Sequence, residues 1–141
     1  MSATSARFPY VTVASARGDS AFVPLLPLEL RLREGEPLTA HGLLDSGSTV
    51  NVLPYALGLR LGANWEKQTT KVTLTGALAA HEARALLLNA RIAQFEPVRL
   101  VFAWSRSENV PLLLGQVNFF EQFDVWFRGA QRQFEITPAR R

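Results

Sequence analysis

The chain has 141 residues and no cysteine, with a formal net charge of +3, and 48% of its residues are hydrophobic while 19% are charged. This composition excludes a disordered chain and predicts one domain with a buried core. The lack of cysteine excludes disulfides, thiolate metal sites and a cysteine nucleophile. No apolar run approaches the roughly 18 residues of a membrane span, and residues 1–8 lack an apolar signal core. We therefore expect a cytoplasmic protein with no membrane partner.

The 15 basic residues, most of them arginine, are spread along the chain, as at Arg31, Arg33, Arg84, Arg99 and Arg132. Nucleic-acid binding requires basic residues gathered in a patch or stripe. The spread in the sequence indicates solvated strand faces, so no nucleic-acid partner is expected.

The chain begins with a small, polar segment, residues 1–7, which predicts a loose tail. Phe8–Val13 has residues typical of a strand, with Pro9 at its start. A turn is predicted at residues 17–20. We expect residues 1–20 to hold a tail and a first strand, and residues 21–138 to form the main domain.

Alternation of apolar and polar residues predicts a strand at Leu28–Arg33, with its leucines facing inward. A turn at residues 34–37 then leads into a second strand, Leu38–Leu44. Further along, we expect a short strand at Val50–Leu53. Pro54 then opens a helical turn through Leu57, which Gly58 and Gly62 end.

The middle of the chain gives conflicting local signals. Lys71–Gly76 alternates and predicts a strand ending on a glycine. Residues 77–93 are rich in good helix formers, so local propensity favours a helix there.

Strands are expected again in the last third of the chain, at Val98–Trp104, Val110–Leu114, 124–127 and 133–136, the last two as a terminal hairpin. Between them, Gln116–Phe123 predicts a short amphipathic helix with Val117, Phe120 and Phe123 on one side.

The stretch that carries chemistry is Leu43-Leu44-Asp45-Ser46-Gly47-Ser48. The two leucines indicate a buried strand end, which leaves Asp45 at the mouth of the strand. Gly47 permits a tight turn, and Ser46 and Ser48 can hydrogen-bond the carboxylate. Taken alone, this pattern is also typical of a surface turn. A second apolar segment, Leu113-Leu114-Gly115, stops on a glycine far downstream.

Together the two segments resemble the signature of the retropepsin family, the single-domain aspartic proteases of retroviral type, in a bacterial style. That signature is two apolar residues, Asp, Thr or Ser, Gly, and Ala, Ser or Thr, followed later by two apolar residues and Gly. Leu43–Ser48 and Leu113–Gly115 match it, and the resemblance spans residues 23–138. It implies an all-β fold, a closed, barrel-like sheet with one or two short helices.

The resemblance also implies strands instead of a helix in residues 82–92, with a hairpin near residues 94–96. The segment before them would form the flap, a hairpin that folds over substrate. Thr75, Gly76 and Ala77 are the flap candidates.

By this resemblance the protein would be an aspartic endopeptidase that needs neither a cofactor nor a metal. The chain has one Asp-Ser-Gly, while Asp19 and Asp124 stand in other contexts. The second carboxylate would therefore be Asp45 of a second subunit, in a homodimer that binds a peptide or protein substrate in extended form. Strands near the termini, Phe8–Val13 and residues 125–136, would supply the interface.

The resemblance assigns roles to the three residues after the aspartate. Ser46 would hydrogen-bond across the twofold axis, the Gly47 N–H would orient the carboxylate, and Ser48 would bond its outer oxygen.

Other chemistries have weaker support in the sequence. His41 and His81 lack metal-ligand spacing, and neither a G-x-S-x-G nor a phosphate-binding loop is present. Trp65 either packs in the core or lines a pocket. The alternative function is a non-catalytic retropepsin-fold module for dimerisation or peptide binding. That alternative is suggested by a flap segment with one glycine, where retroviral flaps have several.

Overall fold

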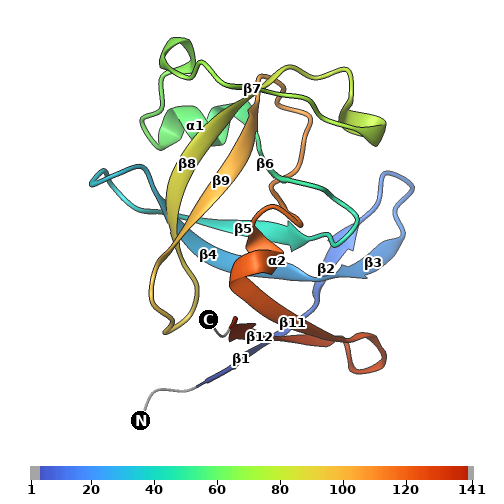
Figure 1. The fold of residues 1–141 in the computed structure, drawn as a ribbon. Helices are drawn as coiled ribbons and strands as arrows, with labels where there is room; N and C mark the ends of the chain where they lie inside the picture. Colours follow the sequence, from blue (N-terminus) through green and yellow to red (C-terminus); the bar gives the residue numbers. More distant parts are fainter. Residues whose placement is uncertain (1–3, 140–141) are drawn as a thin grey trace.

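The computed structural model describes residues 4–139, and β-strands are their main regular secondary structure (Figure 1). The strands are β1 (Ala6–Pro9), β2 (Val11–Ala14), β3 (Ser20–Val23), β4 (Leu25–Arg31), β5 (Leu38–Leu44), β6 (Asn51–Leu53), β7 (Lys71–Val72), β8 (Ala83–Arg91), β9 (Val98–Ser105), β10 (Leu113–Leu114), β11 (Phe123–Arg128) and β12 (Gln133–Pro138). The α-helices are α1 (Tyr55–Arg60) and α2 (Phe119–Gln122), and the short 3-10 helices are η1 (Trp65–Lys67), η2 (Gly76–Leu78) and η3 (Gly129–Gln131). No helix among the described residues is long and apolar enough to cross a membrane.

Six strands close into a barrel in the order β4–β5–β10–β6–β9–β8, and β8 pairs back onto β4 to complete the ring. The β5–β10 and β6–β9 pairs are parallel, and the other pairs are antiparallel. The short strand β10 therefore lies between β5 and β6, which precede it by many residues. The all-β, closed-barrel fold predicted from the sequence is confirmed.

Beside the barrel lies a second, three-stranded sheet in the order β1–β12–β11 (Figure 1). The predicted terminal hairpin is confirmed as β11 and β12. The single strand predicted at Phe8–Val13 is wrong, because the chain changes partners at Tyr10: β1 pairs with β12, whereas β2 pairs with β3. Pro9 has no N–H for a continuing ladder, which favours a break there. The domain boundary expected after residue 20 stays a prediction.

The barrel core follows from the two-residue period of its strands. Along β4, Leu26, Leu28 and Leu30 are buried, and the residues between them are half-buried on the outer face. The strand begins three residues earlier than predicted and ends two residues earlier, at Arg31. Arg33 instead lies in the turn, with a φ of 54°.

Local propensity favours a helix at residues 77–93, but the strands that the resemblance implied at residues 82–92 are confirmed, because residues 83–91 form the nine-residue strand β8. Leu86, Leu88 and Ala90 on β8 are buried in the core, and the strand is paired along its length with β9. Helix propensities differ by only about 0.7 kcal/mol or less between ordinary residues, so pairing and burial decide the outcome.

Helix α1 is longer than predicted, because Gly58 lies inside it and does not end it. A Cβ at Gly58 would overlap the Trp104 indole, so the glycine permits close packing of the helix on β9. The indole N–H of Trp104 in turn donates to the Tyr55 carbonyl at 3.1 Å.

Helix α2 is shorter than predicted. Val117 lies before it and is 48% exposed, whereas Phe119 is the residue that faces the core. Of the strand predicted at Val110–Leu114, only Leu113 and Leu114 pair in the sheet, because they alone reach between β5 and β6.

Candidate active site

The two sequence motifs lie side by side in the barrel. Strands β5 and β10 run parallel, with Leu113 opposite Leu43 and Leu114 opposite Leu44. The N–H of Leu43 donates to the Leu112 carbonyl at 2.9 Å, and the N–H of Asp45 donates to the Leu114 carbonyl at 3.0 Å. The ladder with the second motif therefore continues as far as the backbone of the aspartate.

Within each motif the two leucines face opposite sides of the sheet, as the two-residue period of a strand requires. Leu44 and Leu114 belong to the main core of the barrel. Leu43 and Leu113 belong to a smaller apolar cluster on the other side. Asp45 thus follows directly after a strand end that is packed on both faces.

The Asp45 turn is held by its own backbone. The Gly47 N–H donates to Oδ1 of Asp45 at 3.0 Å, and the Ser48 N–H donates to the Asp45 carbonyl at 3.0 Å. Asp45 is half-buried, whereas Ser46 and Gly47 are exposed. The Ser48 hydroxyl donates to the Val50 carbonyl at 2.7 Å, not to the carboxylate as the resemblance implied. The carboxylate is therefore oriented by a backbone N–H at an accessible surface.

Gly115 brings the second motif against the loop that follows Asp45. A Cβ at Gly115 would lie 2.7 Å from the Ser48 carbonyl oxygen and would overlap the Val50 carbonyl oxygen, so no side chain fits. The next residue, Gln116, donates its backbone N–H to the Ser48 carbonyl at 2.9 Å and its side-chain amide to the Ser46 carbonyl. The two motifs hence form one hydrogen-bonded unit.

A buried amide that the sequence analysis missed joins this unit to the barrel. Asn51 is fully buried; its Oδ1 accepts from the Gly115 N–H at 2.8 Å, and its Nδ2 donates to the Val101 carbonyl and to Oδ1 of Asn118. Asn118 also accepts from the Val101 N–H and donates to the Arg99 carbonyl. The available signal was an asparagine placed inside the apolar strand at residues 50–53.

The predicted flap segment has a different local structure from the one expected. Only Lys71 and Val72 pair with β8, and the flap candidates Thr75, Gly76 and Ala77 lie at the start of η2 and are exposed. The strand predicted at Lys71–Gly76 is therefore wrong beyond Val72. Gly76 has a φ of 64°, a left-handed conformation that glycine adopts readily.

This segment nevertheless packs on the motif strands. Leu74 and Leu78 belong to the same small apolar cluster as Leu43, Leu113 and Val50. The three flap candidates hence lie at the exposed tip of a segment whose base is anchored beside Asp45.

The remaining candidates lie elsewhere. Trp65 is buried in the core against Tyr55 and Trp104, with the Arg84 guanidinium 4.5 Å from its ring centre. His41 is exposed on β5. Within residues 4–139, no three His, Asp or Glu side chains gather closely enough to hold a metal ion.

The barrel, with the aspartate strand beside an inserted leucine strand, is the fold of the retropepsin-like aspartic proteases. A retropepsin-like aspartic protease from Rickettsia conorii matches this structure with a TM-score of 0.60 and 14% sequence identity, over 95% of this chain and 93% of that chain. The EIAV protease, in a complex with the inhibitor HBY-793, matches with a TM-score of 0.51 and 17% identity, over 70% of this chain and 86% of that chain. No protein-family model and no curated protein matches the sequence. The retropepsin-like fold that the two motifs predicted is confirmed.

Proposed function

We propose that the protein is an aspartic endopeptidase whose active site is formed by Asp45 of two subunits. The observation that carries this proposal is the joined unit of the Asp45 turn and Gly115, on a barrel with the retropepsin-like fold. A surface turn without function would need neither the parallel insertion of β10 nor the exclusion of a side chain at Gly115.

The chemistry requires two carboxylates about 3 Å apart that share one proton, because like charges at that distance do not both ionise. One carboxylate takes a proton from a water molecule, and the other polarises the scissile carbonyl. The water then attacks the carbonyl carbon, and no covalent enzyme intermediate is needed.

One chain supplies one such carboxylate. Asp19 lies in the turn before β3, and Asp124 lies on β11 in the three-stranded sheet, so neither belongs to the barrel strands that carry the motifs. A twofold axis that brings two Asp45 turns together would supply the pair. Exposure of Ser46 and Gly47 leaves this turn accessible to a second copy.

The three-stranded sheet offers the apolar surface for that dimer. Strand β11 is an edge strand of this sheet. It carries Trp126, which is 59% exposed, and Phe127, which is 39% exposed. Exposed aromatic residues on an unpaired strand edge are typical of an interface. Pairing of β11 with its copy would extend the sheet across the axis.

An extended peptide is the substrate that suits this architecture. It would lie between the paired Asp45 turns and the flap segments, whose candidates are Thr75, Gly76 and Ala77. The apolar cluster of Leu43 and Leu113 beside the turn favours apolar side chains flanking the cleaved bond.

The test uses an unfolded protein substrate between about pH 4 and 7, the range in which a shared-proton dyad operates. Asp45→Asn is compared with wild type, and Asp124→Asn serves as the matched control. We expect cleavage by wild type and by Asp124→Asn only, with peptide products mapped by mass spectrometry. Cleavage by Asp45→Asn at the wild-type rate would refute the proposal.

The second candidate function is a peptide-binding or dimerisation module without turnover. The anchoring of Leu74 and Leu78 on the motif strands favours it, since a fixed flap limits access to Asp45. It predicts peptide binding by wild type and by Asp45→Asn alike, with no products from either.

A further inference from the structure

Four arginines gather on the outer face of the barrel, where β4 closes onto β8. Strand register places Arg31 opposite Asn89, and Asn89 opposite Arg99 on β9. Paired residues point to the same face of a sheet, so these side chains form a row across three strands. Arg91 extends the cluster along β8, and Arg33 lies in the turn after β4. We call these five residues the arginine face.

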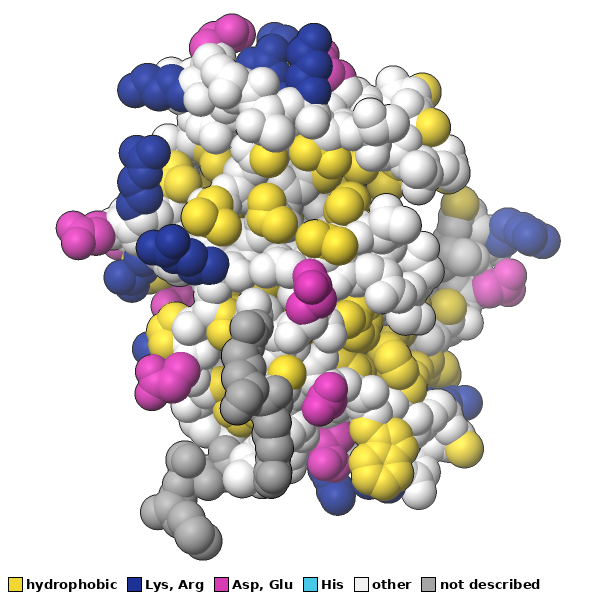
Figure 2. Space-filling view, in the orientation of Figure 1, with side chains coloured by type: hydrophobic (Ala, Val, Ile, Leu, Met, Phe, Trp, Pro, Cys, Tyr) yellow, Lys and Arg dark blue, Asp and Glu magenta, His cyan; other side chains and the backbone are white. Residues whose placement is uncertain are grey.

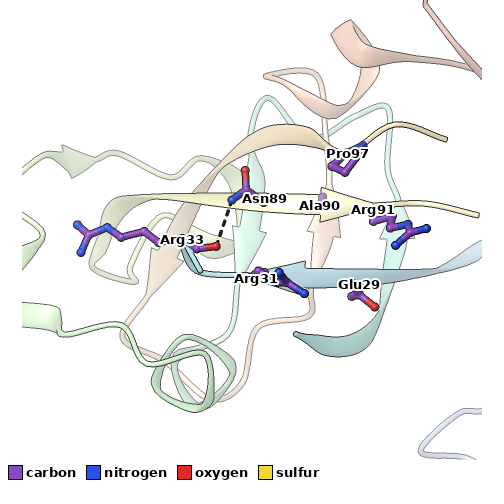
Figure 3. A pocket seen from close by; sticks show the side chains of 7 residues that line it. All are labelled: Glu29, Arg31, Arg33, Asn89, Ala90, Arg91 and Pro97. Atoms are coloured by element: carbon purple, nitrogen blue, oxygen red, sulfur yellow. Dashed lines mark hydrogen bonds between the residues drawn. The ribbon is translucent and has the colours of Figure 1, made fainter. Parts of the chain in front are cut away.

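Two adjacent hollows follow this face. Arg33 and Asn89 line both of them, and their volumes are about 250 and 390 Å³. In the first, Arg31 and Arg91 lie close to Glu29 (Figure 3). Arg31, Arg91 and Arg99 lie on outer strand faces as expected from the sequence, but strand pairing brings these distant positions together.

The arginine face carries positive charge without a partner. In the part of the chain that the structure describes, the ion pairs join Arg7 and Arg128 to Glu135, and Arg84 to Glu82. The four arginines of the face take no part in them. The hollows are lined by four arginines and by two acidic residues, Glu29 and Glu34, so positive charge is in excess there.

The arrangement is receptive to an anion. Arg31 is half-buried, so its charge is screened less than those of Arg33, Arg91 and Arg99, which are exposed. A guanidinium can hold a carboxylate or a phosphate with two parallel hydrogen bonds. The face thus offers several sites for planar anionic groups.

Other features of the hollows distinguish between anionic ligands. Leu87, which is 49% exposed, lines the second hollow beside Arg33 and Arg99. Figure 2 shows basic side chains around the β4–β5 turn and beside β8 and β9, next to a band of apolar side chains. Neither hollow is lined by an aromatic residue on which a base could stack.

We propose that the arginine face binds an acidic, extended segment of a protein partner, with carboxylates on the arginines and an apolar side chain on Leu87. Alternate residues of an extended chain lie about 7 Å apart on one side, and Arg31 and Arg99 stand two strands apart, about 10 Å. Because arginine side chains are long, two or three carboxylates interspersed with apolar residues can reach them despite this difference in spacing.

The arginine face is separate from the Asp45 turn. Strand β4 begins beside the turn, where Leu25 pairs with Leu43, and it ends at Arg31. Six residues of strand span about 20 Å. Binding at the arginine face therefore leaves Asp45 accessible and is independent of the proposed proteolysis.

The test measures the anisotropy of a labelled twelve-residue peptide in which glutamates alternate with leucine and alanine, at about 50 mM salt to limit screening. The Asp45→Asn protein is used so that no cleavage occurs. The comparison variant adds Arg31→Gln and Arg99→Gln. A matched control adds Arg17→Gln and Arg60→Gln, which removes the same charge from exposed positions outside the face.

We expect the face variant to bind at least about tenfold more weakly and the control to bind like its parent, since two charge-assisted contacts are lost only in the first. Circular dichroism verifies folding, and Arg99→Gln alone, at an exposed position, replaces the pair if the double variant unfolds. The proposal is overturned if the peptide does not bind, or if both variants lose the same affinity. It is overturned equally if a twelve-nucleotide single strand or tripolyphosphate binds the face more tightly than the peptide.

Discussion

The backbone N–H of Gly115 donates to Oδ1 of Asn51 at 2.8 Å, which joins the glycine of the second motif to the strand that follows the first. The same asparagine donates to Val101 on β9 and to Asn118, the residue before α2. One buried side chain thereby connects strands β6, β9 and β10. The position of the Asp45 turn depends on this connection, because Gly115 and Gln116 hold the loop after the aspartate.

Asn51→Ala removes this connection. It leaves the Gly115 N–H without its acceptor in a buried site, where an unsatisfied polar group is costly. We expect the free energy of unfolding to fall by about 2–4 kcal/mol, measured by urea denaturation.

Asn109→Ala, an exposed asparagine, is the control, and we expect it to stay within about 0.5 kcal/mol of wild type. Equal stability of the two variants would mean that the amide network does not hold the barrel together.

Gly115→Ala tests the close contact between the motifs. The new Cβ would meet the carbonyl oxygens of Ser48 and Val50, so the loop that carries Asp45 has to move. We expect a loss of at least about 2 kcal/mol in stability, together with a loss of proteolysis.

Gly129→Ala is the matched control, because nothing lies within 4 Å of a Cβ at that position. If Gly115→Ala were as stable and as active as Gly129→Ala, the packing of the two motifs would have no functional role.

The motif pair could be predicted from short, local patterns, whereas the closed-barrel fold was predicted through the family resemblance that these motifs carry. Leu43 and Leu44 before Asp45, and Leu113 and Leu114 before Gly115, each encode a strand end that has to be buried. Once both are strands of one barrel, few arrangements other than adjacency bury all four leucines.

The parts that the sequence could not predict depend on pairing between distant residues. The strand state of residues 83–91 is decided by pairing with β9 and β4; local propensity alone favours a helix there, and only the family resemblance predicted the strand. The role of Asn51 comes from its contacts with Gly115, Val101 and Asn118, and that of Gly58 from its contact with Trp104. The arginine face exists only because the closing register aligns β4, β8 and β9.

The pH dependence of proteolysis is a further prediction. A dyad that shares one proton is active only in its singly protonated form, so the rate should follow a bell-shaped curve with its optimum on the acidic side of neutral. Steady-state rates on a quenched fluorescent peptide measure it. Statine-type peptides should inhibit, because their hydroxyl mimics the tetrahedral transition state. A rate that rises steadily to alkaline pH would indicate a different catalytic group.

Asp45→Asn should abolish proteolysis and preserve the fold. The asparagine keeps an oxygen that can accept from the Gly47 N–H, so the turn retains its hydrogen bond. The thermal midpoint is therefore expected to remain close to that of wild type, while turnover falls to background. Loss of the fold along with activity would leave the two roles of the residue inseparable, and Asp45→Ser would then be compared at the same position.

The dimer gives the last prediction. If each chain contributes half of the site, specific activity should fall on dilution below the dimer dissociation constant. Sedimentation should show the monomer appearing over the same concentration range. Trp126→Lys on the exposed edge of β11 should shift both transitions to higher concentration, because it places a charge in an apolar interface. Mixing wild type with a threefold excess of Asp45→Asn should lower activity per wild-type chain to about one quarter, since random pairing in a twofold dimer leaves only that share of wild-type chains with a wild-type partner. The dimer proposal fails if excess Asp45→Asn leaves the activity per wild-type chain unchanged and a monomer cleaves in proportion to its amount. The second carboxylate would then lie within the chain, and Asp124 would be the first residue to replace.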